Sequence, residues 1–537
     1  MNSKAKIDIP EILDVIFQYL DRRDQINCLH VSRVFYAAII PRIWRSIVMP
    51  SSNQDKKTFP SIETLERFKP YIQALSFTEV LPGYVALRGF NQLKTLSLYN
   101  SYDDGFDTEE DIDKVTDMAL IGLGGFITAH SSTLQDITIR IYGISEVETE
   151  PQTDLWRSLA QCPQLSRLEL SEMWVPSESF PFFLQTCVKT KRLILANVIL
   201  STQSELQYQS IGGISNDSLD DILHTEPQEL ILSITDTAYI GDELNAVQGY
   251  NYGMTVRCLP RLKSLYVNGR SAEFDEIFLQ ELSKSPSSFP YLESLEIRRS
   301  NATDDNLAGF LKKLPRLSNL MIRYHRGPLS LFCQALQSSQ ACESLRYLAL
   351  YRCYNVTSAV VQSVLENCPK LTSLYAKVVT MTDVARGREW ACRDLSYLHV
   401  LISTRNQVDD QDPVSKEQFA EMQRLVFARL GKLTKLEHLN LTSYTAIDFT
   451  GGKTVDLRLE AGLDQLSGLV NLQSLTFGGD MEQQIGVQEV RWMVQHWQRL
   501  KHLVGTLNGD DSVIDEMKAT LKASDISITK SIHIGGM

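Results

Sequence analysis

Arginine and tyrosine recur at one position of a repeated pattern in the middle of the chain. Each follows a short stretch in which apolar and variable residues alternate, as in LEIRR and LMIRY. The set consists of Arg270, Arg298, Arg299, Arg323, Tyr324, His325, Arg326, Tyr351, Arg352 and Lys377. Guanidinium groups bind carboxylates and phosphates through paired N–H groups, and Arg and Tyr are enriched at binding hot spots. The pattern therefore favours a surface that binds an acidic or phosphorylated protein segment.

The side chains expected to contact that partner are Arg298, Arg323, Tyr324, Tyr351 and Arg352. Parallel strands lie about 4.8 Å apart, so residues at the ends of successive strands should stack into a strip. The alternative is an ordinary solvated rim, in which these cations pair with nearby acids such as Glu296.

Catalytic and metal-binding motifs are not found in the sequence. It contains no HExxH, GxSxG, GxGxxG or P-loop motif, and its histidines are scattered. We therefore expect no catalytic residue, no cofactor and no enzyme activity. The nine cysteines include no CxxC pair, so we expect no metal site. Four of them (Cys162, Cys342, Cys368 and Cys392) share one phase of the repeat, which indicates buried, reduced thiols.

An LxxLxL pattern positions the arginines and tyrosines. It occurs fifteen times between residues 72 and 505, counting degenerate copies, with a mean spacing of about 31 residues. Positions 4 and 6 would share one face of a strand. The segments between copies read as helices, with Thr303 and Thr357 as N-caps. Spacing and core resemble leucine-rich repeats, and residues 340–400 resemble their cysteine-containing subclass. The predicted fold is α/β, a curved solenoid with a parallel concave sheet and outer helices.

Four long insertions separate copies of the pattern, at residues 101–117, 143–154, 403–418 and 445–457. The first holds eight acids and one lysine, so we expect solvated loops, which either vary binding or are tolerated insertions. The predicted organisation is an N-terminal helical domain (1–50), a linker (51–66), the solenoid (67–509) and a C-terminal cap (510–537).

The N-terminal segment, residues 9–47, reads as three short helices. Asp21 to Asp24 separates the first two, Ser32 caps the third, and Pro41 ends it. Trp44 and Ile47 follow as an exposed apolar pair. Three short helices cannot bury this many apolar side chains among themselves, so some must contact another surface.

This segment resembles the F-box. The matching residues are Ile9-Pro10-Glu11-Ile12-Leu13, Ile16, Tyr19-Leu20-Asp21, Asp24, Cys28-Leu29, Val31-Ser32-Arg33, Phe35 and Pro41-x-x-Trp44-Arg45. Ile9, Ser32 and Phe35 depart from the family's usual Leu, Cys and Trp, but none adds charge to the apolar surface.

The resemblance implies binding to the Skp-type adaptor of cullin–RING ubiquitin ligases, and through it to a cullin. The implied adaptor contacts are Ile9, Pro10, Leu13, Ile16, Leu20, Val31 and Trp44. The alternative, strongest for Leu13 and Leu20, is that several of them pack the core of the motif itself.

The predicted function is therefore substrate recognition within an SCF-type ubiquitin ligase. A leucine-rich-repeat scaffold without ligase activity is the alternative, and an enzyme framed by the solenoid is a more distant one. The net charge of -12 disfavours nucleic acid as a partner. No apolar run approaches the ~18 residues of a membrane span, and residues 1–11 do not resemble a signal peptide. We expect a soluble protein of the cytoplasm, the nucleus or both, with no membrane partner.

Overall fold

The computed structural model of the chain describes residues 13, 15–48, 60–77, 82–100, 122–141, 150–201, 228–233, 242–259, 261–269, 271–284, 289–338, 340–404, 416–442, 455–477 and 483–529. They belong to two compact units, Met1–Thr235 and Asp236–Met537. Within these described ranges no helix is long and apolar enough to cross a membrane.

The first unit contains a parallel sheet whose strands pair in chain order. The strands are β1 (Ser46–Val48), β2 (Ala74–Phe77), β3 (Thr95–Asn100), β4 (Asp136–Ile141), β5 (Arg167–Ser171), β7 (Arg192–Ala196) and β9 (Glu229–Ser233). The helices are α2 (Arg22–Cys28), α3 (Arg33–Ile43), α4 (Ile62–Phe68), α5 (Pro82–Val85), α7 (Glu150–Ala160) and α8 (Phe180–Lys189). A separate parallel pair joins β6 (Trp174–Val175) to β8 (Ile199–Leu200).

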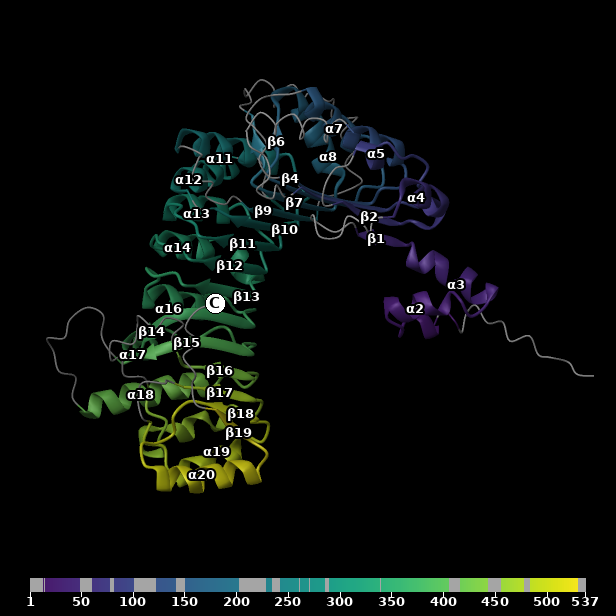
Figure 1. Ribbon diagram of the computed structural model, residues 1–537. Coiled ribbons are helices and arrows are strands. Elements are labelled where there is room, and N and C mark those ends of the chain that lie inside the picture. Colours follow the sequence, from purple (N-terminus) through teal and green to yellow (C-terminus); the bar gives the residue numbers. More distant parts are fainter. Residues whose placement is uncertain are drawn as a thin grey trace, which may run out of the picture. The chain divides into compact units, whose positions relative to one another are not determined.

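The second unit repeats this design, with helices along one side of a parallel sheet (Figure 1). Its strands are β10 (Ser264–Asn268), β11 (Ser294–Arg298), β12 (Asn319–Arg323), β13 (Tyr347–Tyr351), β14 (Ser373–Thr380), β15 (Tyr397–Ser403), β16 (His438–Asn440), β17 (Ser474–Thr476), β18 (His502–Val504) and β19 (Ser527–Thr529). Its helices are α11 (Asp242–Arg257), α12 (Ala272–Ser283), α13 (Asp304–Leu311), α14 (Ser330–Ser338), α15 (Ala341–Ser344), α16 (Ser358–Asn367), α17 (Met381–Arg386), α18 (Lys416–Gly431), α19 (Val487–His496) and α20 (Asp511–Ala523).

A row of leucines explains why these strands stack in register. Position 4 of each repeat pairs with position 4 of the next, and every member of the row is buried. In the second unit the row is Leu265, Leu295, Leu320, Leu348, Leu374, Leu398, Leu439, Leu475 and Leu503. Each repeat gains a neighbour for its apolar face, and stacking buries one continuous core. The predicted α/β architecture, resembling a leucine-rich-repeat solenoid, is confirmed.

Hydrogen bonds cap the helices and join neighbouring helices to each other. Thr303 caps α13, and its hydroxyl accepts from the amide of Asn306 at 3.4 Å. Thr357 occupies the N-cap of α16 without a side-chain bond to that helix. Carboxylates also join neighbouring repeats, because Asp304 at the start of α13 accepts from the amides of Leu331 (2.7 Å) and Phe332 (2.8 Å) in α14.

The four cysteines that share one phase are buried, as predicted. Cys342, Cys368 and Cys392 fill equivalent positions of three successive repeats, and Cys162 fills the same position in the first unit. A thiol acts there as a small apolar group. Cys342 and Cys368 are close neighbours, with sulfur atoms 2.6 Å apart. Burial raises the pKa of Cys392 to about 12, which keeps that thiol protonated.

Several boundaries differ from the predictions. Pro41 lies inside α3, which continues to Ile43, because a proline near the end of a helix removes only one hydrogen bond. The expected loops at 143–154 and 403–418 give way to α7 and α18, which begin at Glu150 and Lys416. The remainder of these two insertions up to those helices, apart from residues 403 and 404, lies outside the described residues, as does the whole of 101–117. So does 445–454 of the fourth insertion, while Val455 and Leu457 at its end are buried.

Candidate docking surfaces

The N-terminal helices have a small core of their own. Leu13, Phe17 and Ile39 are buried together, and Leu20 packs half-buried against them. Phe17 and Phe35 meet edge to face, with centroids 5.9 Å apart. The predicted cap at Ser32 is confirmed, since its hydroxyl accepts from the amide of Phe35 at 3.2 Å. Leu13 and Leu20 therefore pack the core of the motif itself, which is the alternative position expected for them.

The same helices expose a concentrated set of apolar side chains: Val15, Ile16, Tyr19, Ile26, Val31, Val34 and Tyr36. Ile16 is 46% exposed, Val31 62% and Tyr19 85%. They are seven of the seventeen exposed large apolar side chains in the described ranges, and all seven fall within residues 15–36. Exposed apolar side chains at this density indicate a surface that a partner covers. We call these seven residues the apolar surface.

The predicted adaptor contacts thus divide into four groups. Ile16 and Val31 belong to the apolar surface, whereas Leu13 and Leu20 face the motif's core. Ile9 and Pro10 lie outside the described residues. Trp44 has an intramolecular partner, described below.

Five members of the apolar surface were missed by the sequence analysis, namely Val15, Tyr19, Ile26, Val34 and Tyr36. Val15, Ile16 and Tyr19 follow helical spacing on one side of the first helix, whereas Leu13, Phe17 and Leu20 follow it on the other side. Dividing the apolar residues of positions 13–20 into these two sets would have revealed which of them are exposed.

Trp44 and Ile47 tie the motif to the first repeats of its own unit. The indole of Trp44 stacks on Phe68 of α4. Ile47 is buried in β1, which pairs with β2, so the prediction of an exposed pair was wrong for Ile47. The carbonyl of Arg45 accepts from the amides of Gln73 (2.8 Å) and Ala74 (3.0 Å). A strand of the sheet therefore begins inside the segment expected to be purely helical.

The predicted basic strip lies along the strand ends of the second unit. Arg298 and Arg323 occupy one row of the sheet with Tyr351. Glu296 pairs with both arginines, at 2.6 Å to Arg298 and 3.4 Å to Arg323. The alternative of cations paired with Glu296 thus holds for these two arginines. Arg270 lies outside the described residues.

Arginines of the strip also lie over tyrosine rings. The guanidinium of Arg298 is 5.0 Å from the ring of Tyr266, that of Arg323 is 5.3 Å from Tyr351, and that of Arg352 is 5.2 Å from Tyr324. Such cation–π contacts hold an arginine flat on a ring while its N–H edge still faces outward.

Five residues directly after strands have left-handed backbone conformations: Glu172 and Asn197 in the first unit, and Arg299 (φ 54°), Tyr324 (φ 59°) and Arg352 (φ 52°) in the second. Two amides of the second unit extend the ladder, since Arg299 N donates to Arg323 O and Tyr324 N to Tyr351 O, both at 2.8 Å. Bulky residues are disfavoured in this conformation, and such strain is often found at binding sites. Asn197 holds the equivalent place after β7, with φ 51°.

A group of tyrosines on the same sheet face was not recognised from the sequence. We call Tyr347, Tyr351, Tyr375 and Tyr397 the tyrosine cluster. Ring centroids lie 5.6 Å apart for Tyr347–Tyr375, 5.3 Å for Tyr351–Tyr375 and 4.4 Å for Tyr375–Tyr397. Burial and neighbouring phenols raise the pKa of Tyr347 to about 12, so its hydroxyl is neutral at physiological pH.

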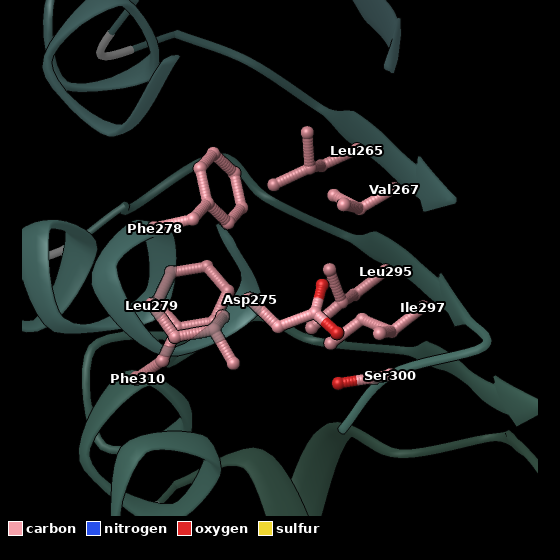
Figure 2. Close-up of a pocket in the computed structure, with 9 residues that line it drawn as sticks. All are labelled: Leu265, Val267, Asp275, Phe278, Leu279, Leu295, Ile297, Ser300 and Phe310. Atoms are coloured by element: carbon pink, nitrogen blue, oxygen red, sulfur yellow. The ribbon is translucent and has the colours of Figure 1, made fainter. Parts of the chain in front are cut away.

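The second unit also has a small cavity of about 10 Å³ between α12 and the sheet, lined by Asp275, Phe278, Ile297 and Ser300 among others (Figure 2). Burial raises the pKa of Asp275 to about 7, against the lowering effects of the amide of Asn301, 2.8 Å away, and the hydroxyl of Ser300. The space holds about one water molecule, which is too little for a substrate. Asp275 is thus a structural carboxyl group that joins two repeats.

His399 is a further titratable group that serves packing. His399 is buried on β15, where burial lowers its pKa to about 3 and its Nε2 lies 3.2 Å from the carbonyl of Thr442. No group of three His, Cys, Asp or Glu side chains that could hold a metal occurs within the described ranges.

Comparison with known proteins identifies the N-terminal segment. A protein-family profile described as F-box-like matches residues 10–50. The chain therefore carries an F-box-like domain, which includes the apolar surface. No curated protein matches the chain in sequence. Among solved structures it resembles the crystal structure of the TLR13-ssRNA13 complex, with a TM-score of 0.40 and 14% identity over 84% of this chain. The chain spans 58% of the length of that protein.

Proposed function

We propose that this chain is the substrate-recognition subunit of an SCF-type cullin–RING ubiquitin ligase. The F-box-like domain binds a Skp-type adaptor, and through it a cullin, while the second unit binds the protein to be modified. Catalysis then comes from proximity to another subunit, so this chain needs no catalytic residue. Such a role places the protein in the cytoplasm, the nucleus or both.

The apolar surface is the observation that carries this proposal. The helices of the F-box-like domain already bury Leu13, Phe17 and Ile39 among themselves, yet they leave Ile16, Tyr19 and Val31 in water. An amphipathic helical surface of this kind fits a hydrophobic groove on a partner.

Co-purification tests the proposal. The full chain would be captured with a tag, and adaptor and cullin would be measured by immunoblot. Recovery of both, and loss of both in an Ile16→Ser, Val31→Ser double variant, is the expected result. Adaptor without cullin would favour the non-ligase scaffold instead. Failure of the wild-type chain to recover the adaptor would contradict the proposal outright.

A further inference from the structure

The tyrosine cluster occupies a sheet face that the helices do not cover. Helices of the second unit lie on the opposite side of the strands (Figure 1). Ala349 points to the same face as Tyr347 and Tyr351, because these residues alternate along β13, and it pairs with Tyr375 in register. Ala349 is fully buried there, so the rings lie over it. Tyr375 stacks between Tyr351 and Tyr397, with planes 29° and 24° from parallel, so the rings form an aromatic shelf whose edges face outward.

The shelf is built of the side chains that most often provide binding energy. All four tyrosines are half-buried, so each ring is held by its neighbours and still offers surface. Aromatic rings that are already fixed lose little conformational entropy on binding, and their hydroxyls add hydrogen bonds at the edge.

Charge next to the shelf points to the sign of the partner. Among the described side chains that face outward from β10 to β15, Glu296 is the one carboxylate, whereas Arg298 and Arg323 stand beside it. Arg352 follows directly after β13. This excess of positive charge occurs in a chain whose net charge is -12. A partner that supplies a carboxylate would complete the pairing of these guanidinium groups.

Distances within the site set the spacing between the carboxylate of the partner and the side chain that contacts the tyrosines. The guanidinium of Arg323 lies 5.3 Å from the ring of Tyr351, and the ring of Tyr375 on the next strand lies 5.3 Å from that ring. The sum of these two distances is the largest separation of the arginine from Tyr375, and an extended chain, at about 3.4 Å per residue, covers it in about three residues.

We propose that the tyrosine cluster, with Arg323 and Arg352, recognises an extended polypeptide segment in which an acidic side chain lies about three residues from a large apolar one. The apolar side chain packs against the outward edge of the Tyr375 ring, and the carboxylate faces the arginines. This inference rests on the proposed role of the second unit in partner binding. A nucleic acid is a poorer fit, because a phosphate on every nucleotide calls for a longer row of cations than these.

Peptide selection on the purified full-length chain tests the proposal. A library of random twelve-residue peptides displayed on phage would be selected against wild type. The enriched sequences should pair Asp or Glu with Trp, Phe, Tyr or Leu at a spacing of about three residues. Enrichment without that pairing, or no enrichment at all, would overturn the proposal.

Affinity measurements on the enriched peptide locate its site. Fluorescence anisotropy should show at least fivefold weaker binding for Arg323→Ala and at least tenfold for Tyr375→Ala, while Tyr375→Phe, which keeps the ring, changes little. Tyr291→Ala is the matched control, because that exposed tyrosine also lies beside an arginine, Arg316, but outside the cluster. Circular dichroism checks that each variant is folded. If Tyr375→Ala does not fold, the affinity of Arg323→Ala decides the test. Equal affinities for wild type and Arg323→Ala, or displacement of the peptide by a twenty-nucleotide oligothymidine, would refute the assignment.

Adaptor recovery by the same proteins separates the two proposals. The apolar surface belongs to the first unit, so Arg323→Ala should recover the adaptor as wild type does. Peptide binding without adaptor recovery would contradict the ligase role alone. Adaptor recovery without selective peptide binding would contradict the present inference alone.

Discussion

The indole of Trp44 stacks on the ring of Phe68, with centroids 4.3 Å apart and planes 11° from parallel. Phe68 ends α4, which leads through a short 3₁₀ helix (Lys69–Tyr71) into β2. The stack thus fastens the last turn of the F-box-like domain to the start of the repeats.

Breaking this stack should cost stability from either side. We expect Trp44→Ala and Phe68→Ala each to lower the free energy of unfolding by roughly 1–3 kcal/mol, with a coupling of about 1 kcal/mol in the double variant. Urea unfolding of the full chain measures these values. If Trp44 contacts the adaptor instead, Trp44→Ala alone would weaken adaptor binding and the coupling would vanish.

Adaptor binding should separate exposed from buried apolar residues. Ile16→Ser and Val31→Ser remove exposed contacts, so we expect each to weaken adaptor binding by about 2 kcal/mol, roughly thirtyfold, with little change in melting temperature. Leu13→Ala, at a site only 3% exposed, should instead lower the free energy of unfolding by roughly 2–5 kcal/mol. Isothermal titration and thermal melts distinguish the two effects. Val470→Ser, at an exposed site in the second unit, is the control and should leave binding unchanged.

Backbone strain at Arg352 should be separable from its charge. Asparagine tolerates a left-handed conformation better than most residues, as Asn197 illustrates after β7. We therefore expect Arg352→Asn to leave the free energy of unfolding unchanged or slightly higher, and Arg352→Val to lower it by about 1–2 kcal/mol. Equal stabilities of the two variants would contradict the assigned strain. Both variants lose the guanidinium, so a shared loss of partner binding reports on charge.

Asp275 should make stability depend on pH. Its folded pKa of about 7 lies above the ~3.9 of an unfolded aspartate, so the folded state resists ionisation. The penalty is absent below pH ~4, grows as pH rises to about 7 and then stays constant. Relative to Asp275→Asn, wild type should lose stability over that window, by an amount of the order of 4 kcal/mol. Urea unfolding at several pH values tests this, with the exposed Asp305→Asn as control. A difference that is flat with pH would exclude the assigned ionisation.

The regular spacing of the repeats, and the alternation of apolar and variable residues within each strand, made much of the fold predictable from the sequence. Leu295 and Ile297 alternate with variable residues, and parallel stacking then places each leucine beside its equivalent in the next repeat. The caps at Ser32 and Thr303 were predictable as well, because they depend on residues within four positions.

Side-chain contacts across strands were harder to predict. Glu296 was expected among the acids that pair with these cations, but its pairing with both Arg298 and Arg323 depends on rotamers and on the register of two strands. The tyrosine cluster depends on which face of its strand each residue occupies, since Tyr347 and Tyr375 must point to the same face of adjacent strands. Aligning the variable positions of successive LxxLxL copies would have revealed it.

Strand β1 has a practical consequence for dissecting the protein. Its three residues cover the edge of β2, whose backbone groups would otherwise be open to other chains. A version that lacks the F-box-like domain would therefore expose the unpaired edge of β2, which can associate with other chains, and the face of Phe68 that Trp44 covers. Its aggregation would be mistaken for loss of partner binding by the second unit. Point substitutions on the apolar surface leave that edge covered, so they are the more faithful way to uncouple the two activities.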